Sequence, residues 1–305
     1  MLLLGLAWAL CRPAAAADCP QPADEILKIE AATLCIVLGD AETAPRKALL
    51  HEWIARSARI VADYYGRFPA TLVQLKVRST EGDGVGGGRT TNESGLTIQI
   101  RVGRDASAAD LRQDWVLVHE MVHLALPEIG YTHNWLAEGL ATYVEGVARA
   151  QAGNRDIADV WAEDRHSMPM GLPRSGEGGM DDTRTWGRTY WGGALFCLQA
   201  DVAIRAQTSN RIGLQSALQA ILRDTGGYAN ERDIVPVLRL GDAATGTHVL
   251  EDLYQRSRTT AVTTDLDALW KELGVPPDPK TQPFDDRAPL APIRIAITAK
   301  PAQHS

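Results

Sequence analysis

Basic residues are too few and too dispersed in this sequence to indicate a nucleic-acid-binding protein. The 305 residues contain 31 Lys and Arg against 38 Asp and Glu, so the formal net charge is −7. No dense run of Lys or Arg interrupts this acidic balance. Nucleic-acid binders usually carry a basic patch or stripe, and we therefore expect no nucleic-acid partner.

Cysteine is also scarce, with four residues in the whole chain. None of them has the close spacing that is typical of a structural zinc site. Cys19 and Cys35 are near enough in the sequence to pair in an oxidising compartment, and the sequence leaves open whether they do. Cys197 lies in an apolar helical segment and is predicted to be a buried free thiol.

Long apolar segments are missing, and the run at residues 1–10 is too short to span a bilayer. Small residues follow it at 14–17, where a signal peptidase could cut, although no Lys or Arg precedes the run. We predict a signal peptide over residues 1–17 and export to the periplasm or the exterior, with no stable membrane span after its removal. A short membrane anchor and a lipoprotein attached at Cys11 are the alternatives.

The remaining sequence predicts one α+β domain over residues 18–275 and a Pro-rich tail over residues 276–305. Apolar residues make up 45% of the chain, which is enough for a substantial core. Apolar or alternating patterns predict strands over residues 33–38, 71–78 and 96–102. The last two are expected to form a hairpin-like pair, joined by a flexible Gly-rich connection over residues 82–88. A small N-terminal mixed sheet should therefore precede a mainly helical part.

Apolar residues at helical spacing predict most of the other elements. The predicted helices cover residues 43–65, 107–126, 135–149, 190–205, 209–222, 231–239, 248–257 and 265–273. Residues 152–185 contain several glycines and prolines and are predicted to be irregular. In the tail, the apolar run at residues 293–297 has a strand-like pattern.

One segment carries the clearest chemical pattern: His119-Glu120-Met121-Val122-His123. Residues four apart lie on one face of a helix, so both histidines can bind one metal ion while Glu120 stays free. Glu138, in the next predicted helix, can supply a third ligand. Two histidines and a glutamate form a catalytic Zn²⁺ site with one open position. The alternatives are a pair of ordinary histidines and a solvated helix carboxylate.

The sequence around these residues resembles the gluzincin metallopeptidases, in which a glutamate follows the HExxH motif. The stretch WLAEGLATYVE, from Trp135 to Glu145, is similar to their glutamate-bearing helix. The stretch RTYWGGALFCLQADVAIR, from Arg188 to Arg205, is similar to the glycyl-aminopeptidase family, whose Tyr-x-x-Gly-Ala helix start provides a catalytic tyrosine. The resemblance implies a zinc peptidase in which Tyr190 is catalytic. No Gly-x-Met-Glu-Asn motif occurs upstream, which leaves aminopeptidase and endopeptidase activity open.

These residues define an expected mechanism and an alternative to it. Glu120 would activate water for attack on a peptide or protein substrate, and Tyr190 would donate a hydrogen bond to the oxyanion. The strand at 96–102 could pair with an extended peptide. The alternative is a non-catalytic peptide- or protein-binding module with a structural metal. The oligomeric state stays open.

Several other residues are candidates for supporting roles. Asp114 and Thr142 could accept hydrogen bonds from the ligand histidines. Glu145 is interpreted either as such a supporting group or as a salt-bridged carboxylate. The remaining candidates are the rim residue His133 and two arginines that could bind a substrate carboxylate or form ordinary ion pairs, Arg184 and Arg188.

Overall fold

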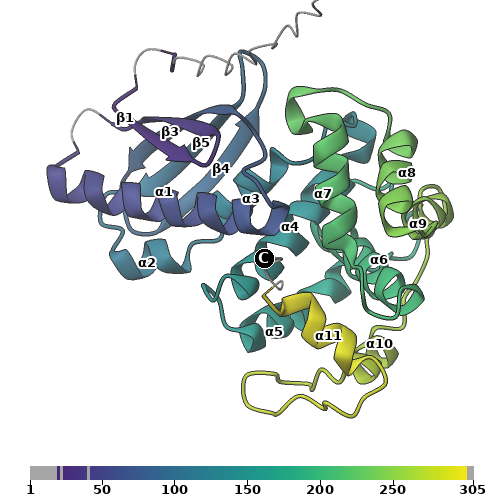
Figure 1. Ribbon diagram of the computed structural model, residues 1–305. Coiled ribbons are helices and arrows are strands. Elements are labelled where there is room, and N and C mark those ends of the chain that lie inside the picture. The colour runs from purple at the N-terminus through teal and green to yellow at the C-terminus, as the bar shows by residue number, and fades with distance from the viewer. Residues whose placement is uncertain (1–18, 21–22, 40–41, 301–305) are drawn as a thin grey trace, which may run out of the picture.

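The chain folds into a small mixed sheet followed by a mainly helical part, which confirms the α+β prediction (Figure 1). The structure is a computed structural model, and it describes residues 19–20, 23–39 and 42–300. The predicted signal peptide, residues 1–17, lies outside the described residues. Among the described helices, none has both the length and the apolar character that crossing a membrane requires.

The sheet has five strands in the order β1-β2-β3-β5-β4. Their bounds are Glu25–Ile29 (β1), Ala32–Val37 (β2), Leu72–Thr80 (β3), Val85–Thr91 (β4) and Thr97–Gly103 (β5). β2, β3 and β5 run parallel, while β1 and β4 are antiparallel to their neighbours. The predicted hairpin-like pair is therefore wrong, because β3 and β5 are parallel neighbours.

The Gly-rich segment is not the flexible connection that the sequence predicts. Residues 85–91 form β4, which pairs with β5 and occupies the edge of the sheet. Glycine favours neither strand nor helix, so the pattern of side chains gives no indication of this strand. Its extended conformation comes from the ladder of hydrogen bonds with β5. The strand that offers a free edge is therefore β4, whereas β5 is enclosed by β3 and β4.

Helix α1 (Ala44–Tyr65) covers one face of the sheet, close to its predicted bounds (Figure 1). The alternation along β3 places Val73, Leu75 and Val77 in the core against this helix. Trp53 of α1 is fully buried in the same core. The helix ends at Gly66, whose φ of 75° is a left-handed cap that glycine adopts without strain.

The predicted helix over residues 107–126 is divided into two helices, α2 (Ala108–Gln113) and α3 (Val116–His123). Asp114 lies between them with an extended ψ of 134°. Its carboxylate accepts hydrogen bonds from the backbone N–H groups of Val116 and Leu117 and from Trp53 Nε1. Asp114 thus satisfies the free donors at the start of α3, and it fixes that helix to α1.

The helical part follows, and its elements occupy the right-hand and lower parts of the molecule in Figure 1. They are α4 (Asn134–Gln151), α5 (Ile157–Ser167), a π-helical turn (Arg188–Gly192), α6 (Gly193–Gln207), α7 (Leu214–Thr225), α8 (Ile234–Thr245), α9 (Val249–Ser257) and α10 (Leu266–Leu273). The prediction that residues 152–185 are irregular missed α5. Helix α7 begins after the predicted residue 209, because Ser209 and Asn210 adopt left-handed conformations.

The strand-like run at residues 293–297 is part of a helix, α11 (Ala291–Thr298). Pro292 occupies the first turn, where a proline favours helix initiation. Ile293 and Ile297 are four residues apart and both buried, while Ile295 between them is 50% exposed. A run of this length fits either period, and packing of one face against the domain selects the helix.

Cys19 and Cys35 form a disulfide, which resolves the alternative that the sequence left open. Cys197 is a buried free cysteine in α6, as predicted. The disulfide joins the segment before the sheet to β2. Such bonds persist in oxidising compartments, which is compatible with export.

Candidate metal centre

Helices α3 and α4 bring the three predicted metal ligands together. Glu138 Oε2 lies 3.2 Å from His119 Nε2 and 3.5 Å from His123 Nε2. One ligand atom from each residue lies within 4.8 Å of the others. Donor atoms bound to one tetrahedral zinc ion at its usual distances of about 2.0–2.2 Å are themselves roughly 3.3 Å apart. The spacing and the donor set therefore fit zinc.

Burial and mutual contact set the charge states of these three side chains. Burial opposes the ionised form of Glu138, but hydrogen bonds to both histidines lower its pKa well below the usual range. Burial also disfavours protonation of His123, yet contact with Glu138 raises the pKa of that imidazole. For His119 burial prevails, and its pKa is lowered. The carboxylate is thus ready to act as a ligand.

Two glycines let α6 approach α4 and place Tyr190 at the centre. A Cβ atom on Gly139 would lie 2.2 Å from the Gly193 backbone, and one on Gly193 would lie 2.1 Å from the Trp135 carbonyl oxygen. Only glycine permits this contact. Tyr190, in the π-helical turn before α6, stacks on the His119 ring with centroids 6.3 Å apart. Burial and the charge of Glu138 raise the pKa of Tyr190 to about 12, so its hydroxyl remains a donor at neutral pH.

Strand β4 holds the remaining predicted catalytic residue, Glu120. Thr90 Oγ1 lies 2.7 Å from Glu120 Oε2 and 2.8 Å from the Glu120 carbonyl oxygen. A Cβ atom on Gly88 would lie 2.5 Å from Glu120 Cγ. The strand therefore closes over the carboxylate only because residue 88 has no side chain. Sequence reasoning missed both Gly88 and Thr90, because it treated the Gly-rich segment as a connection.

The expected hydrogen-bond acceptors for the ligand histidines are elsewhere. Asp114 caps α3, and the Thr142 hydroxyl donates to the Glu138 carbonyl oxygen, so both predictions are wrong. His119 Nδ1 is buried and has no hydrogen-bond partner within the described residues. The His119 ring is instead fixed by packing, with Trp115 edge-on at 5.6 Å.

The other supporting candidates have structural contacts. Glu145 is buried and forms a 2.6 Å ion pair with Arg149, so the salt-bridge interpretation holds. Arg188 donates to the Gly171 carbonyl oxygen, and Arg184 lies over the ring of Tyr131. His133 Nδ1 contacts Asp181 Oδ1 at 3.2 Å. None of these contacts places a side chain on the three ligands.

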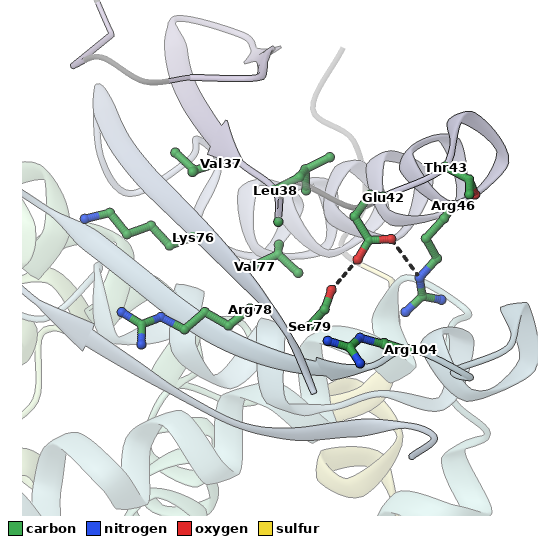
Figure 2. Close-up of a pocket in the computed structure, with 11 residues that line it drawn as sticks. Val37, Leu38, Glu42, Thr43, Arg46, Lys76, Val77, Arg78, Ser79 and Arg104 are labelled. Atoms are coloured by element: carbon green, nitrogen blue, oxygen red, sulfur yellow. Dashed lines mark hydrogen bonds and ion pairs between the residues drawn. The ribbon is translucent and has the colours of Figure 1, made fainter. Parts of the chain in front are cut away.

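An open cavity of about 340 Å³ adjoins two of the three ligands. His123 and Glu138 line it, together with Arg89 and Thr90 of β4 and Tyr228. A larger cavity of about 910 Å³ lies at the carboxyl ends of β2 and β3 (Figure 2). It contains none of the predicted site residues, so the smaller cavity is the one relevant to the cluster.

Neither a protein-family model nor a curated protein sequence matches the chain. In fold it is similar to an aminopeptidase N family protein from Idiomarina loihiensis, with a TM-score of 0.57 and 13% identity over 81% of this chain and 48% of that one. An M1 zinc metallopeptidase from Deinococcus radiodurans gives a TM-score of 0.50 and 16% identity over 79% of this chain and 52% of that one. A two-domain M1 zinc metallopeptidase bound to L-arginine gives 0.51 and 16% identity over the same shares.

These similarities show a fold like that of M1 zinc metallopeptidases, which are gluzincins. The chain spans about half the length of these neighbours. The fold implied by the resemblance is confirmed, while activity and residue roles are matters for proposal.

Proposed function

We propose that the protein is an exported zinc-dependent peptidase. The observation that carries this proposal is the convergence of His119, His123 and Glu138 beside a glutamate that is not part of the cluster. A purely structural zinc site is usually closed by four protein ligands. Here the described residues offer three, next to an open cavity. The zinc-metallopeptidase fold of the structural neighbours supports the same reading.

Zinc held by these residues would supply Lewis acidity and lower the pKa of a water molecule towards neutrality. Glu120 follows the first ligand in sequence, and its Oε2 is engaged by Thr90, which leaves Oε1 to accept the proton of the attacking water. Glu120 would then deliver that proton to the leaving amine. Tyr190, protonated at neutral pH, would donate a hydrogen bond to the developing oxyanion.

The free edge of β4 favours an extended peptide as substrate. An exposed strand edge can pair with a peptide backbone, and β4 is the outermost strand on this side of the sheet. Thr90 of β4 contacts Glu120, so a peptide paired with this edge would pass the proposed base. The expectation that the strand at 96–102 has this role is replaced by β4, because β5 is enclosed.

The test compares the wild type with Glu120→Gln. Both proteins should contain one zinc ion by elemental analysis, while only the wild type should hydrolyse a diverse peptide library. A second library with blocked N-termini separates the two peptidase classes, because an aminopeptidase requires a free amine. Full hydrolysis by Glu120→Gln would refute the mechanism. Zinc binding without cleavage of any peptide would favour the alternative, a peptide-binding module.

A further inference from the structure

The face of the sheet opposite α1 gathers basic side chains. Lys76 and Arg78 of β3 lie together on one side of the strand, and Val77 and Ser79 lie on the other (Figure 2). In the ladder, Arg78 is opposite Arg101 of β5, and Lys76 is opposite Gln99 of β5. We call this surface the basic face; it comprises Lys28, Lys76, Arg78 and Arg101, whereas Arg89 lines the cavity beside the ligands.

Neighbouring groups confirm which side of the sheet these residues share. A Cβ atom on Gly87, the β4 partner of Arg101, would lie 3.2 Å from Arg101 Nη2. Lys28 of β1 donates to Thr33 of β2, its cross-strand partner. All members except the half-buried Lys76 are exposed.

Carboxylates do not neutralise the basic face. Within the part of the chain that the structure describes, none of its four members forms an ion pair. Glu25 of β1 points the other way and contacts His51 of α1. Like charges that are directly opposite, such as Arg78 and Arg101, repel each other. An anionic partner would relieve this repulsion, although the chain as a whole carries a net charge of −7.

We propose that the basic face docks on the anionic headgroups of a phospholipid surface. The face is the surface of a sheet with few apolar anchors, and its exposed large apolar side chain is Ile26 of β1. Protein interfaces usually centre on aromatic and other apolar anchors. A broad array of cations with one apolar side chain instead matches a charged membrane surface.

The disulfide places the N-terminal segment on the same side. Cys35 is the cross-strand partner of Gln74, which shares its side of β3 with Lys76 and Arg78. Cys19 is bonded to Cys35 and therefore enters the domain at the basic face. Removal of residues 1–17 would leave this arrangement intact, so the docking requires only the processed chain.

Vesicle sedimentation tests the proposal with matched charge changes. The purified exported protein should sediment with vesicles of equal phosphatidylglycerol and phosphatidylcholine, but not with phosphatidylcholine alone, and salt should release it. Lys76→Glu with Arg78→Glu should weaken binding at least about 25-fold, since each basic residue contributes about fivefold. Arg223→Glu with Lys271→Glu makes the same change in net charge on exposed residues of α7 and α10, and it should leave binding unchanged.

Equal loss of binding in both double variants, or no sedimentation of the wild type, would overturn the proposal. Retention on an acidic polypeptide or on DNA without sedimentation on vesicles would also overturn it. Peptide hydrolysis by the Lys76→Glu, Arg78→Glu variant should equal that of the wild type, because neither residue lines the cavity beside the ligands. Docking and peptidase activity can therefore fail separately.

Discussion

Helices α3 and α4 and the edge strand β4 build the same centre in opposite ways. The helices contribute side chains at fixed spacing, so that His119, His123 and Glu138 meet. The strand contributes Thr90 and, at Gly88, the lack of a side chain, which lets it lie against Glu120. The helices thus define the proposed zinc site, whereas the strand positions the proposed base. The two functions should be separable by substitution.

The largest effect is expected from Glu138→Ala, which removes one of the three proposed zinc ligands that α3 and α4 contribute. Two histidines alone do not complete the three-ligand set of a catalytic zinc site. The variant should lose zinc on dialysis and show no detectable peptide hydrolysis, as measured by elemental analysis and by peptide cleavage. Its thermal unfolding in the absence of zinc should remain cooperative. Retention of one zinc ion per chain would show that Glu138 is not a ligand.

Gly88→Ala should displace the proposed base, Glu120, and leave the three proposed zinc ligands in place. The new Cβ atom would lie 2.5 Å from Glu120 Cγ, so either β4 or the carboxylate must move. Misplacement of a catalytic group by about 1 Å can reduce the rate about 100-fold. We expect such a loss in kcat with zinc content unchanged.

Gly86→Ala is the matched control for this substitution. Gly86 also lies in β4, but a Cβ atom on it would have Arg101 Cβ as its nearest neighbour, at 3.8 Å, which is an ordinary contact. Its kcat should be close to that of the wild type. Loss of zinc in Gly88→Ala, or an equal loss of activity in both variants, would contradict the division between helices and strand.

Thr90→Val should lower kcat by a smaller factor, again by disturbing Glu120. Valine keeps the β-branched shape and removes the hydroxyl that lies 2.7 Å from Glu120 Oε2. A hydrogen bond to a charged group contributes about 1.5–3 kcal/mol, so we expect kcat to fall at least about tenfold with zinc retained. Thr90→Ser should restore most of the rate. Equal rates for Val and Ser would assign Thr90 a packing role only.

The proposed zinc ligands on α3 and α4 could be predicted from the sequence for a physical reason. Residues four apart on a helix are neighbours whatever the rest of the fold does, so His119 and His123 could be assigned to one cluster. Glu138 required a second motif, and Tyr190 required the resemblance to a family. The bounds of α1 and the presence of the sheet also followed from local periodicity.

The contacts of β4 with Glu120 and the basic face both depend on pairing between distant segments, which local patterns do not encode. Gly88 meets Glu120 only because β4 pairs antiparallel with β5. Likewise, Arg78 and Arg101 are far apart in sequence and become neighbours through the parallel register of β3 and β5. Scattered basic residues in an acidic chain therefore gave no sequence indication of the basic face.

Asp164→Asn should change the stability of the fold and leave the proposed zinc ligands and Glu120 unaffected. Asp164 is buried in α5, where burial and the charge of Glu163 raise its pKa to about 8. The usual value in an unfolded chain is about 3.9. Between pH 4 and pH 8 the native state therefore holds a proton that the unfolded state releases, and stability falls as pH rises through this window.

Asparagine cannot ionise, so Asp164→Asn should be more stable than the wild type at pH 8. The difference should be on the order of 1–3 kcal/mol in urea unfolding, since each unit of pKa shift corresponds to about 1.4 kcal/mol. It should shrink towards pH 4 and vanish below that pH, where the wild-type carboxyl becomes neutral in both states. The exposed Asp156, at the start of the same helix, provides the control, and Asp156→Asn should show no such trend. Unchanged kcat in Asp164→Asn would place this buried carboxyl outside the centre, whereas a loss of zinc would show that α5 supports the proposed zinc ligands.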